Sequence, residues 1–268
     1  MSTGNKTAFS LVELLVVIAI ISLLMGLLMP ALTVSRLQSR RILCKSNIRQ
    51  LLLANTGYAA QNDGSYVPAA MDILSSNRRR WHGVRNDNES PFDSAKGPLA
   101  SYLDDGRVNR CPQKVNFVEV NPRDNHYEKG AGGYGYNMIY LGSRIWQAYE
   151  DQNCRITAKD FQVAQPAQTL MFADAAMVDF YQDGAGYLEY SFAEPRYFVI
   201  NGEIDTIWDP LPSIHFRHRS HANIGWADGH VDSRKIAEYS GPNPLIIKAA
   251  RLNLGWFEPL DNSLFDLK

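Results

Sequence analysis

A long apolar stretch near the start of the chain is its most pronounced pattern. Residues 14–29 carry no charged side chain, and with apolar neighbours the stretch reaches about 22 residues, enough at ~1.5 Å rise per residue to cross a ~30 Å hydrocarbon layer. A short polar leader precedes it, and the only plausible cleavage position, between Ala8 and Phe9, lies before the apolar residues. Cleavage there leaves the stretch on the mature protein as a membrane anchor.

The helical pattern continues beyond Pro30. One apolar stripe, spaced by seven residues, runs along a single helix face and consists of Leu37, Cys44, Leu51 and Tyr58. Asp63-Gly64 is a typical helix stop. We therefore predict one helix of roughly 50 residues, with residues 9–32 as its transmembrane half and residues 33–63 as its extramembrane half.

The remainder, residues 64–268, shows the short alternating segments of a β-rich head. Residues 169–174 predict a buried strand ending on Asp174, residues 134–140 a second strand, and residues 187–200 one or two antiparallel strands. Residues 222–226 alternate before Asp228-Gly229, a strong hairpin signal. The predicted class is α+β: a long N-terminal helix packed on an antiparallel β-sheet head with long loops. The segment after Asp232 has no predicted placement.

Composition and charge narrow the function classes. The chain has 268 residues and a net charge of −1, so no basic excess indicates a nucleic-acid partner. One dense basic patch, residues 78–80, precedes Trp81 and His82. We interpret it as a solvated loop in preference to a phosphate or lipid site.

Glu13 is the unusual residue of the apolar stretch. A carboxylate within a membrane span is costly and by default functional. Cleavage before Phe9 creates an α-ammonium group within about a turn of Glu13, and this group is the natural partner of the Glu13 carboxylate. The pair can form within one chain or between staggered neighbouring chains. The alternative is that Glu13 only marks the helix start, where the helix dipole favours an acid.

Residues 8–13, Ala-Phe-Ser-Leu-Val-Glu, followed by about twenty apolar residues, resemble the class III signal of type IV pilins and type II secretion pseudopilins. Alanine stands at position 8, where the family usually has glycine. The resemblance implies a leader of residues 1–8, removal by a prepilin peptidase, N-methylation of Phe9 and a role of Glu13 in assembly.

The same resemblance implies a structural, non-enzymatic subunit of a type II secretion or type IV pilus-like assembly, acting with other pilin-like subunits and the secretion or pilus machinery. It places the chain as a single-pass protein of the inner membrane, with the head outside the cytoplasm and incorporation in a filament to follow. The positive-inside rule favours the opposite orientation, because basic residues follow the span at Arg36, Arg40, Arg41, Lys45 and Arg49. We follow the specific signal.

Three cysteines are too few for a disulfide scaffold, and no local Cys/His spacing predicts a zinc site. Cys44 lies on the apolar stripe, where a bridge from helix to head would start, and Cys111 is the better partner. A Cys44–Cys111 disulfide in an oxidising compartment and two buried thiols remain equal alternatives.

Four of six histidines fall within sixteen residues, at positions 215, 218, 221 and 230. His218, nine residues and then Asp228-Gly229, the element spanning residues 218–231, resemble the His-X9-Asp-Gly element of a planctomycete-type family of pseudopilin-like proteins. We expect His218 to hydrogen-bond Asp228 and brace the hairpin, with no cofactor. The alternative is a membrane-anchored metal-binding or hydrolytic head, in which His218, His221, Asp228 and Asp174 hold a divalent metal.

Overall fold

The computed structural model describes residues 11–113, 115–118, 128–179, 186–205, 210–239 and 243–268. The predicted leader and Phe9 lie outside the described residues. The chain divides into two compact units, Met1–Arg40 and Arg41–Lys268. Helix α1 runs from Leu11 to Gln61 and supplies residues to both. It ends where Asp63 and Gly64 adopt left-handed backbone conformations, and the Gly64 N–H donates to the Ala59 carbonyl.

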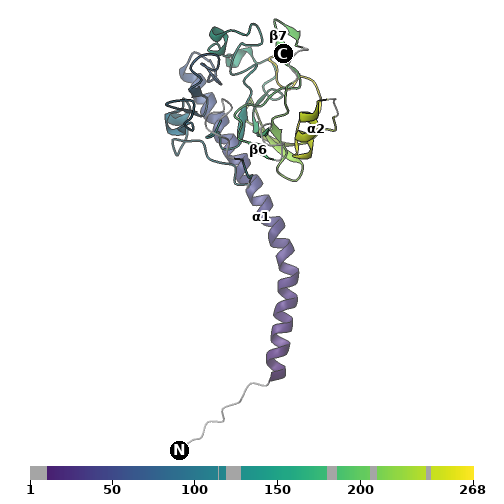
Figure 1. Ribbon diagram of the computed structural model, residues 1–268. Coiled ribbons are helices and arrows are strands. Elements are labelled where there is room, and N and C mark those ends of the chain that lie inside the picture. Colours follow the sequence, from purple (N-terminus) through teal and green to yellow (C-terminus); the bar gives the residue numbers. More distant parts are fainter. Residues whose placement is uncertain (1–10, 114, 119–127, 180–185, 206–209, 240–242) are drawn as a thin grey trace, which may run out of the picture. The chain divides into compact units, whose positions relative to one another are not determined.

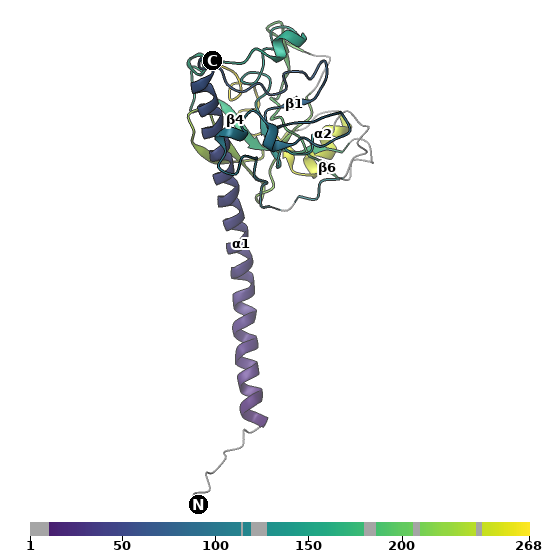
Figure 2. The same ribbon diagram turned by 90° about the vertical axis from the view of Figure 1, so that its left-hand side faces the viewer.

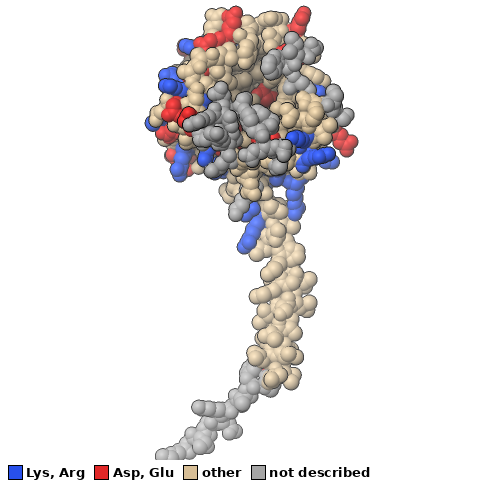
Figure 3. Space-filling view, in the orientation of Figure 1, with Lys and Arg blue, Asp and Glu red and all other residues tan. Residues whose placement is uncertain are grey.

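The first unit contains the apolar part of α1. Its large apolar side chains between Leu11 and Met29 are all 44% exposed or more, and the face visible in Figure 3 is almost entirely uncharged. This helix is long and apolar enough to cross a membrane. A continuous apolar surface of this kind is unfavourable in water but suits lipid, which is consistent with a membrane anchor.

The second unit is built on a four-stranded antiparallel sheet with the order β11-β10-β4-β3. Its strands are β3 (Tyr134–Tyr136), β4 (Leu170–Asp174), β10 (His221–Trp226) and β11 (Val231–Lys235). β10 and β11 form a hairpin in which Ile224 pairs with Asp232. The turn closes through the Trp226 N–H and the His230 carbonyl, with Gly229 at a φ of 93°. The predicted hairpin is confirmed.

The C-terminal part of α1 packs on one face of this sheet (Figures 1 and 2). Ile48 and Leu52 of the helix lie over Gly225 of β10, where an added Cβ would stand 2.5 Å from Ile48. The close approach therefore requires glycine at this position. The opposite face of the sheet carries Ile224 and Trp226. It packs against a second apolar core that includes Phe257, from the C-terminal segment of the chain. Both faces of β3, β4 and β10 are therefore largely buried, whereas the edge strand β11 is only half-buried.

Short elements complete the head. In the described part of the chain, eight further short strands form four two-stranded antiparallel ladders, β1-β2, β5-β6, β7-β8 and β9-β12. They are β1 (Arg79–Arg80), β2 (Gly83–Val84), β5 (Met177–Val178), β6 (Tyr187–Leu188), β7 (Val199–Ile200), β8 (Glu203–Ile204), β9 (Ile214–His215) and β12 (Leu254–Gly255). Helix α2 spans Pro244–Arg251 and is capped by the Asn243 side chain. Four 3-10 turns lie at Ser94–Lys96, Ala100–Tyr102, Asp151–Cys154 and Asp160–Gln162.

The structure confirms the α+β class and corrects some strands. The buried strand predicted at residues 169–174 is β4. The strand predicted for residues 134–140 stops at Tyr136, because the chain turns there and the buried Asn137 side chain donates to the carbonyls of Leu170 and Phe265. The pieces of residues 187–200 pair with β5 and β8 rather than with each other. The unplaced C-terminal segment forms α2 and β12 and closes the second core.

Candidate functional site

Four polar side chains from distant parts of the chain meet inside the head: Cys44, Cys111, Asp174 and His218, here called the buried thiol cluster. One ligand atom of each lies within 4.8 Å of all the others. The Cys44 thiol donates to Asp174 Oδ1 at 3.0 Å, and His218 Nε2 lies 3.3 Å from Asp174 Oδ2. The Cys111 sulfur lies 3.8 Å from the same nitrogen. Thiols, imidazole and carboxylate therefore converge on one point.

Each member is held by a different element. Cys44 lies on the buried face of α1, and Asp174 is the last residue of the buried strand β4. Cys111 is fixed by its N–H, which donates to the Gly132 carbonyl. His218 opens a tight turn in which its N–H donates to the His221 carbonyl, while the two intervening residues, Arg219 and Ser220, have φ values of 56° and 60°. Such backbone conformations persist where the surrounding structure imposes them.

Three further groups surround the buried thiol cluster. Asp174 Oδ2 accepts the backbone N–H of Asn223 at 2.8 Å, and the Tyr134 hydroxyl donates to Cys44 at 3.5 Å. The guanidinium group of Arg217 donates to the Ala175 carbonyl and interacts electrostatically with Asp174 and both thiols. These contacts orient the four central side chains and place a positive charge beside three groups that can be anionic.

The ionisation of the cluster follows from these contacts. Burial by itself would raise the pKa of Asp174, but the hydrogen bond from His218 and the charge of Arg217 hold it below its usual value. Burial disfavours the charged form of His218, yet its hydrogen bonds to Asp174 and Cys111 raise its pKa to about 9. The neighbouring Cys44 and the contact with His218 lower the pKa of Cys111 to about 6, whereas burial raises that of Cys44. These shifts favour an ion pair of His218 and Asp174 next to the two thiols.

The predicted hydrogen bond between His218 and Asp228 is wrong. His218 contacts Asp174, whereas Asp228 lies in the hairpin turn, where its Oδ1 accepts the His230 N–H and lies 2.6 Å from His230 Nδ1. The six residues of β10 separate the two positions, a span of about 20 Å at ~3.3 Å per residue. Asp228 and Gly229 shape the turn instead of contacting the histidine.

The metal-ligand set suggested by sequence is only partly brought together. Asp174 and His218 lie in the buried thiol cluster. His221 and Asp228 do not belong to it: the His221 Nδ1 atom lies 2.9 Å from the Arg219 carbonyl oxygen, and Asp228 contacts His230. The cysteines Cys44 and Cys111 do come together, as free thiols. Their place beside Asp174 and His218 could not be predicted from sequence, because local spacing is the only signal and these residues are far apart in the chain. The contact of Arg217 with this cluster was not predicted either, although Arg217 is next to His218.

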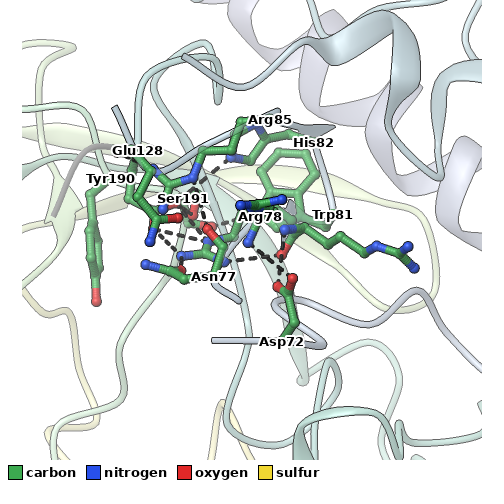
Figure 4. A network of polar contacts seen from close by, with 12 residues as sticks. Asp72, Asn77, Arg78, Trp81, His82, Arg85, Glu128, Tyr190 and Ser191 are labelled. Atoms are coloured by element: carbon green, nitrogen blue, oxygen red, sulfur yellow. Dashed lines mark hydrogen bonds and ion pairs between the residues drawn. The ribbon is translucent and has the colours of Figure 1, made fainter. Parts of the chain in front are cut away.

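The interpretation of residues 78–80 as a solvated loop is wrong for Arg80, which is 2% exposed. Its guanidinium group binds Glu128 through Nε and Nη2, the latter at 2.7 Å. Glu128 also accepts the Ser191 hydroxyl at 2.6 Å (Figure 4). Burial by itself would raise the pKa of Glu128, but the charge of Arg80, the nearby His82 ring and the Arg80 hydrogen bonds lower it to about 2. The neighbouring Trp81 and His82 are buried as well.

A separate, mainly apolar pocket of roughly 690 Å³ is lined in part by Glu194. Glu194 is 4% exposed and accepts the Tyr190 hydroxyl at 2.6 Å. Burial raises its pKa to about 7, although the Tyr190 hydrogen bond opposes the shift. Among the described residues, its second oxygen Oε2 has no hydrogen-bond partner. The folded head therefore favours the protonated, neutral form of this side chain.

We expect Glu194→Gln to stabilise the head above pH 7. The folded-state pKa exceeds the ordinary value of 4.5, so this group's contribution to stability is complete below about pH 4.5 and is lost as pH rises to about 7, a loss of roughly 3 kcal/mol. Glutamine is neutral at every pH and removes that loss. Denaturant unfolding at pH 5 and pH 8 measures the change in the free energy of unfolding between the two pH values.

The control is Glu203→Gln, at an exposed position on the same pocket, which should show the same change as wild type. An equal change in wild type and in Glu194→Gln would contradict the expectation.

The N-terminal processing residues stand apart from the head. Ala8 and Phe9 lie outside the described residues, and Glu13 lies in the first turn of α1. Residues 4–29 match the family model for the prokaryotic N-terminal methylation motif. No curated protein and no solved structure matches the chain. The motif supports a pilin-like protein with a prepilin-type N-terminus, and it covers the leader and the apolar helix but not the head.

Proposed function

We propose that the chain is a structural pilin-like subunit, cut before Phe9 by a prepilin peptidase, methylated on the new terminus and assembled with other pilin-like subunits in a type II secretion or type IV pilus-like filament. The observation that carries the proposal is the methylation motif at residues 4–29. It coincides with an apolar helix whose large side chains between Leu11 and Met29 are all 44% exposed or more.

Assembly gives the apolar surface of α1 two successive environments. In the membrane, lipid covers the exposed side chains of residues 11–29. In a filament, the same side chains pack against α1 helices of neighbouring subunits. Glu13 is then close to the α-ammonium group of a neighbour's Phe9, which neutralises its charge and sets the axial register between the helices.

The head of such a subunit lies outside the cytoplasm and serves as a structural body rather than an enzyme. Its most reactive group of side chains, the buried thiol cluster, consists of residues that are 5% exposed or less, apart from the half-buried Cys111. A substrate has little access to such a group. The alternative of a hydrolytic head using His221 and Asp228 lacks support, because these residues do not converge with His218.

Mass spectrometry of the mature N-terminus, on protein from membranes of the native host, tests this function. We expect a chain that begins at N-methylated Phe9. A matched Phe9→Ala variant is analysed in the same way. If the mature chain begins at position 9, the mass of its N-terminal peptide should change by the difference between phenylalanine and alanine. An intact terminus at Met1 or Ser2 overturns the proposal, because Glu13 then has no processed terminus as a partner.

A further inference from the structure

The buried thiol cluster has the composition and geometry of a metal site. Cysteine sulfur, histidine nitrogen and aspartate oxygen are the three ligand types that zinc uses in proteins, and with bond lengths of ~2.0–2.3 Å a tetrahedral ion needs ligand atoms about 3.3–3.8 Å apart. The distances are 3.0 Å from Cys44 Sγ to Asp174 Oδ1, 3.3 Å from the other carboxylate oxygen, Oδ2, to His218 Nε2, and 3.8 Å from His218 Nε2 to Cys111 Sγ. The remaining pairs lie within 4.8 Å.

We propose that Cys44, Cys111, Asp174 and His218 bind one Zn²⁺ ion, which joins helix α1 to the sheet and loops of the head. This inference concerns the head alone and does not depend on processing or assembly.

The charges around the cluster fit this ion. Two thiolates and one carboxylate bring three negative charges, and Zn²⁺ leaves a net charge of −1. Arg217 supplies the compensating positive charge beside Asp174 and both thiols. Neutralisation of this kind is required where ionised groups are taken out of water.

The surroundings resemble the outer contacts of zinc sites, where hydrogen bonds orient the ligands. The Asn223 N–H holds the Asp174 carboxylate, and the Tyr134 hydroxyl donates to the Cys44 sulfur. Tyr134 is itself oriented by the Asn47 amide at 3.1 Å. A pocket beside the cluster is lined in part by Cys111 and Arg217, and an ion would approach the cluster from this side.

Four protein ligands indicate a structural rather than a catalytic ion, because catalytic zinc keeps one position open for water or substrate. The ligands are separated by 67, 63 and 44 residues along the chain, from positions 44, 111, 174 and 218. One ion therefore links the helix, a loop, the central strand β4 and the turn before β10. It also holds apart two adjacent thiols that would otherwise be free to oxidise to a disulfide.

The test is the metal content of the full chain, purified from membranes in detergent without chelators and measured by inductively coupled plasma mass spectrometry. We expect one zinc ion per chain, lost in Cys111→Ser and retained in Cys154→Ser. Cys154 is the matched control, because it is a buried free thiol whose sulfur lies near the Glu150 carbonyl, away from the cluster. Equal zinc in wild type and Cys111→Ser overturns the proposal, as does a zinc-free protein with a Cys44–Cys111 disulfide in non-reducing peptide mapping.

A second measurement uses only the wild-type chain, in case Cys111→Ser fails to fold. Zinc is removed with a chelator under reducing conditions and replaced by Co²⁺. We expect visible absorption bands of a tetrahedral ion together with a thiolate-to-cobalt charge-transfer band in the near ultraviolet, both lost when Zn²⁺ is added back. Absence of the charge-transfer band excludes thiolate ligation and overturns the assignment.

Discussion

Glu13→Ala is expected to abolish incorporation of the chain into filaments while leaving its insertion in the membrane intact. In the proposed filament the Glu13 carboxylate pairs with the α-ammonium group of a neighbour's Phe9 in an apolar environment. Truncating one partner of such a pair costs about 2–5 kcal/mol per contact, which corresponds to a loss of more than tenfold in affinity. The measurement is the fraction of the chain that sediments with sheared filaments, relative to the fraction that remains in membranes.

The matched control is Ser22→Ala, which removes a neutral polar group from the same apolar stretch of α1. It should assemble like wild type, because no charge pair is lost. Mass spectrometry of the Glu13→Ala chain must show the same mature terminus as wild type, so that assembly and processing are separated. A processed Glu13→Ala chain that enters filaments as efficiently as wild type would refute the proposed pairing.

Glu128→Gln is expected to destabilise the head by about 3–5 kcal/mol, because it leaves the buried Arg80 without its counter-charge. The guanidinium group binds Glu128 at 2.7 Å, with side-chain exposures of 1% and 6% for the two residues. Denaturant unfolding at pH 7 measures the change. Asp151→Asn is the control, because the Arg155–Asp151 pair has a similar distance of 2.8 Å but exposures of 57% and 40%. An exposed pair of this kind contributes about 1 kcal/mol or less.

The same variant should change the response to acid. The folded-state pKa of Glu128 is about 2, below the ordinary value of 4.5, so the pair's contribution is complete above about pH 4.5 and is lost as pH falls towards 2. Glu128→Gln removes that part of the acid sensitivity. Replacing both partners, as in Arg80→Met with Glu128→Leu, should cost less than Glu128→Gln alone, since no unpaired charge is buried. A Glu128→Gln chain no less stable than Asp151→Asn would show that the pair is not needed.

Local patterns in the chain were sufficient for the long helix, its end and the C-terminal hairpin. The apolar stretch, the stripe through Cys44 and Leu51, and Asp228-Gly229 each act through neighbours in sequence, so a periodicity or a turn signal reveals them. The basic residues 78–80 show the opposite case. Their local composition predicts a solvent-exposed loop. Arg80 is nevertheless buried, because Glu128, 48 residues away in the sequence, pairs with it.

The sequence by itself determined an apolar helix long enough to cross a membrane, the N-terminal methylation motif at residues 4–29 and the α+β class. The tertiary structure alone decided the partners of the reactive side chains. Asp228 and His218 are close in sequence but separated by the extended strand β10, whereas Cys44, Cys111 and Asp174 are distant in sequence and converge with His218. Sequence spacing defines distances only within one element. Packing of α1 on the sheet and the turn before β10 bring the ligand atoms together, and no local pattern encodes those long-range contacts.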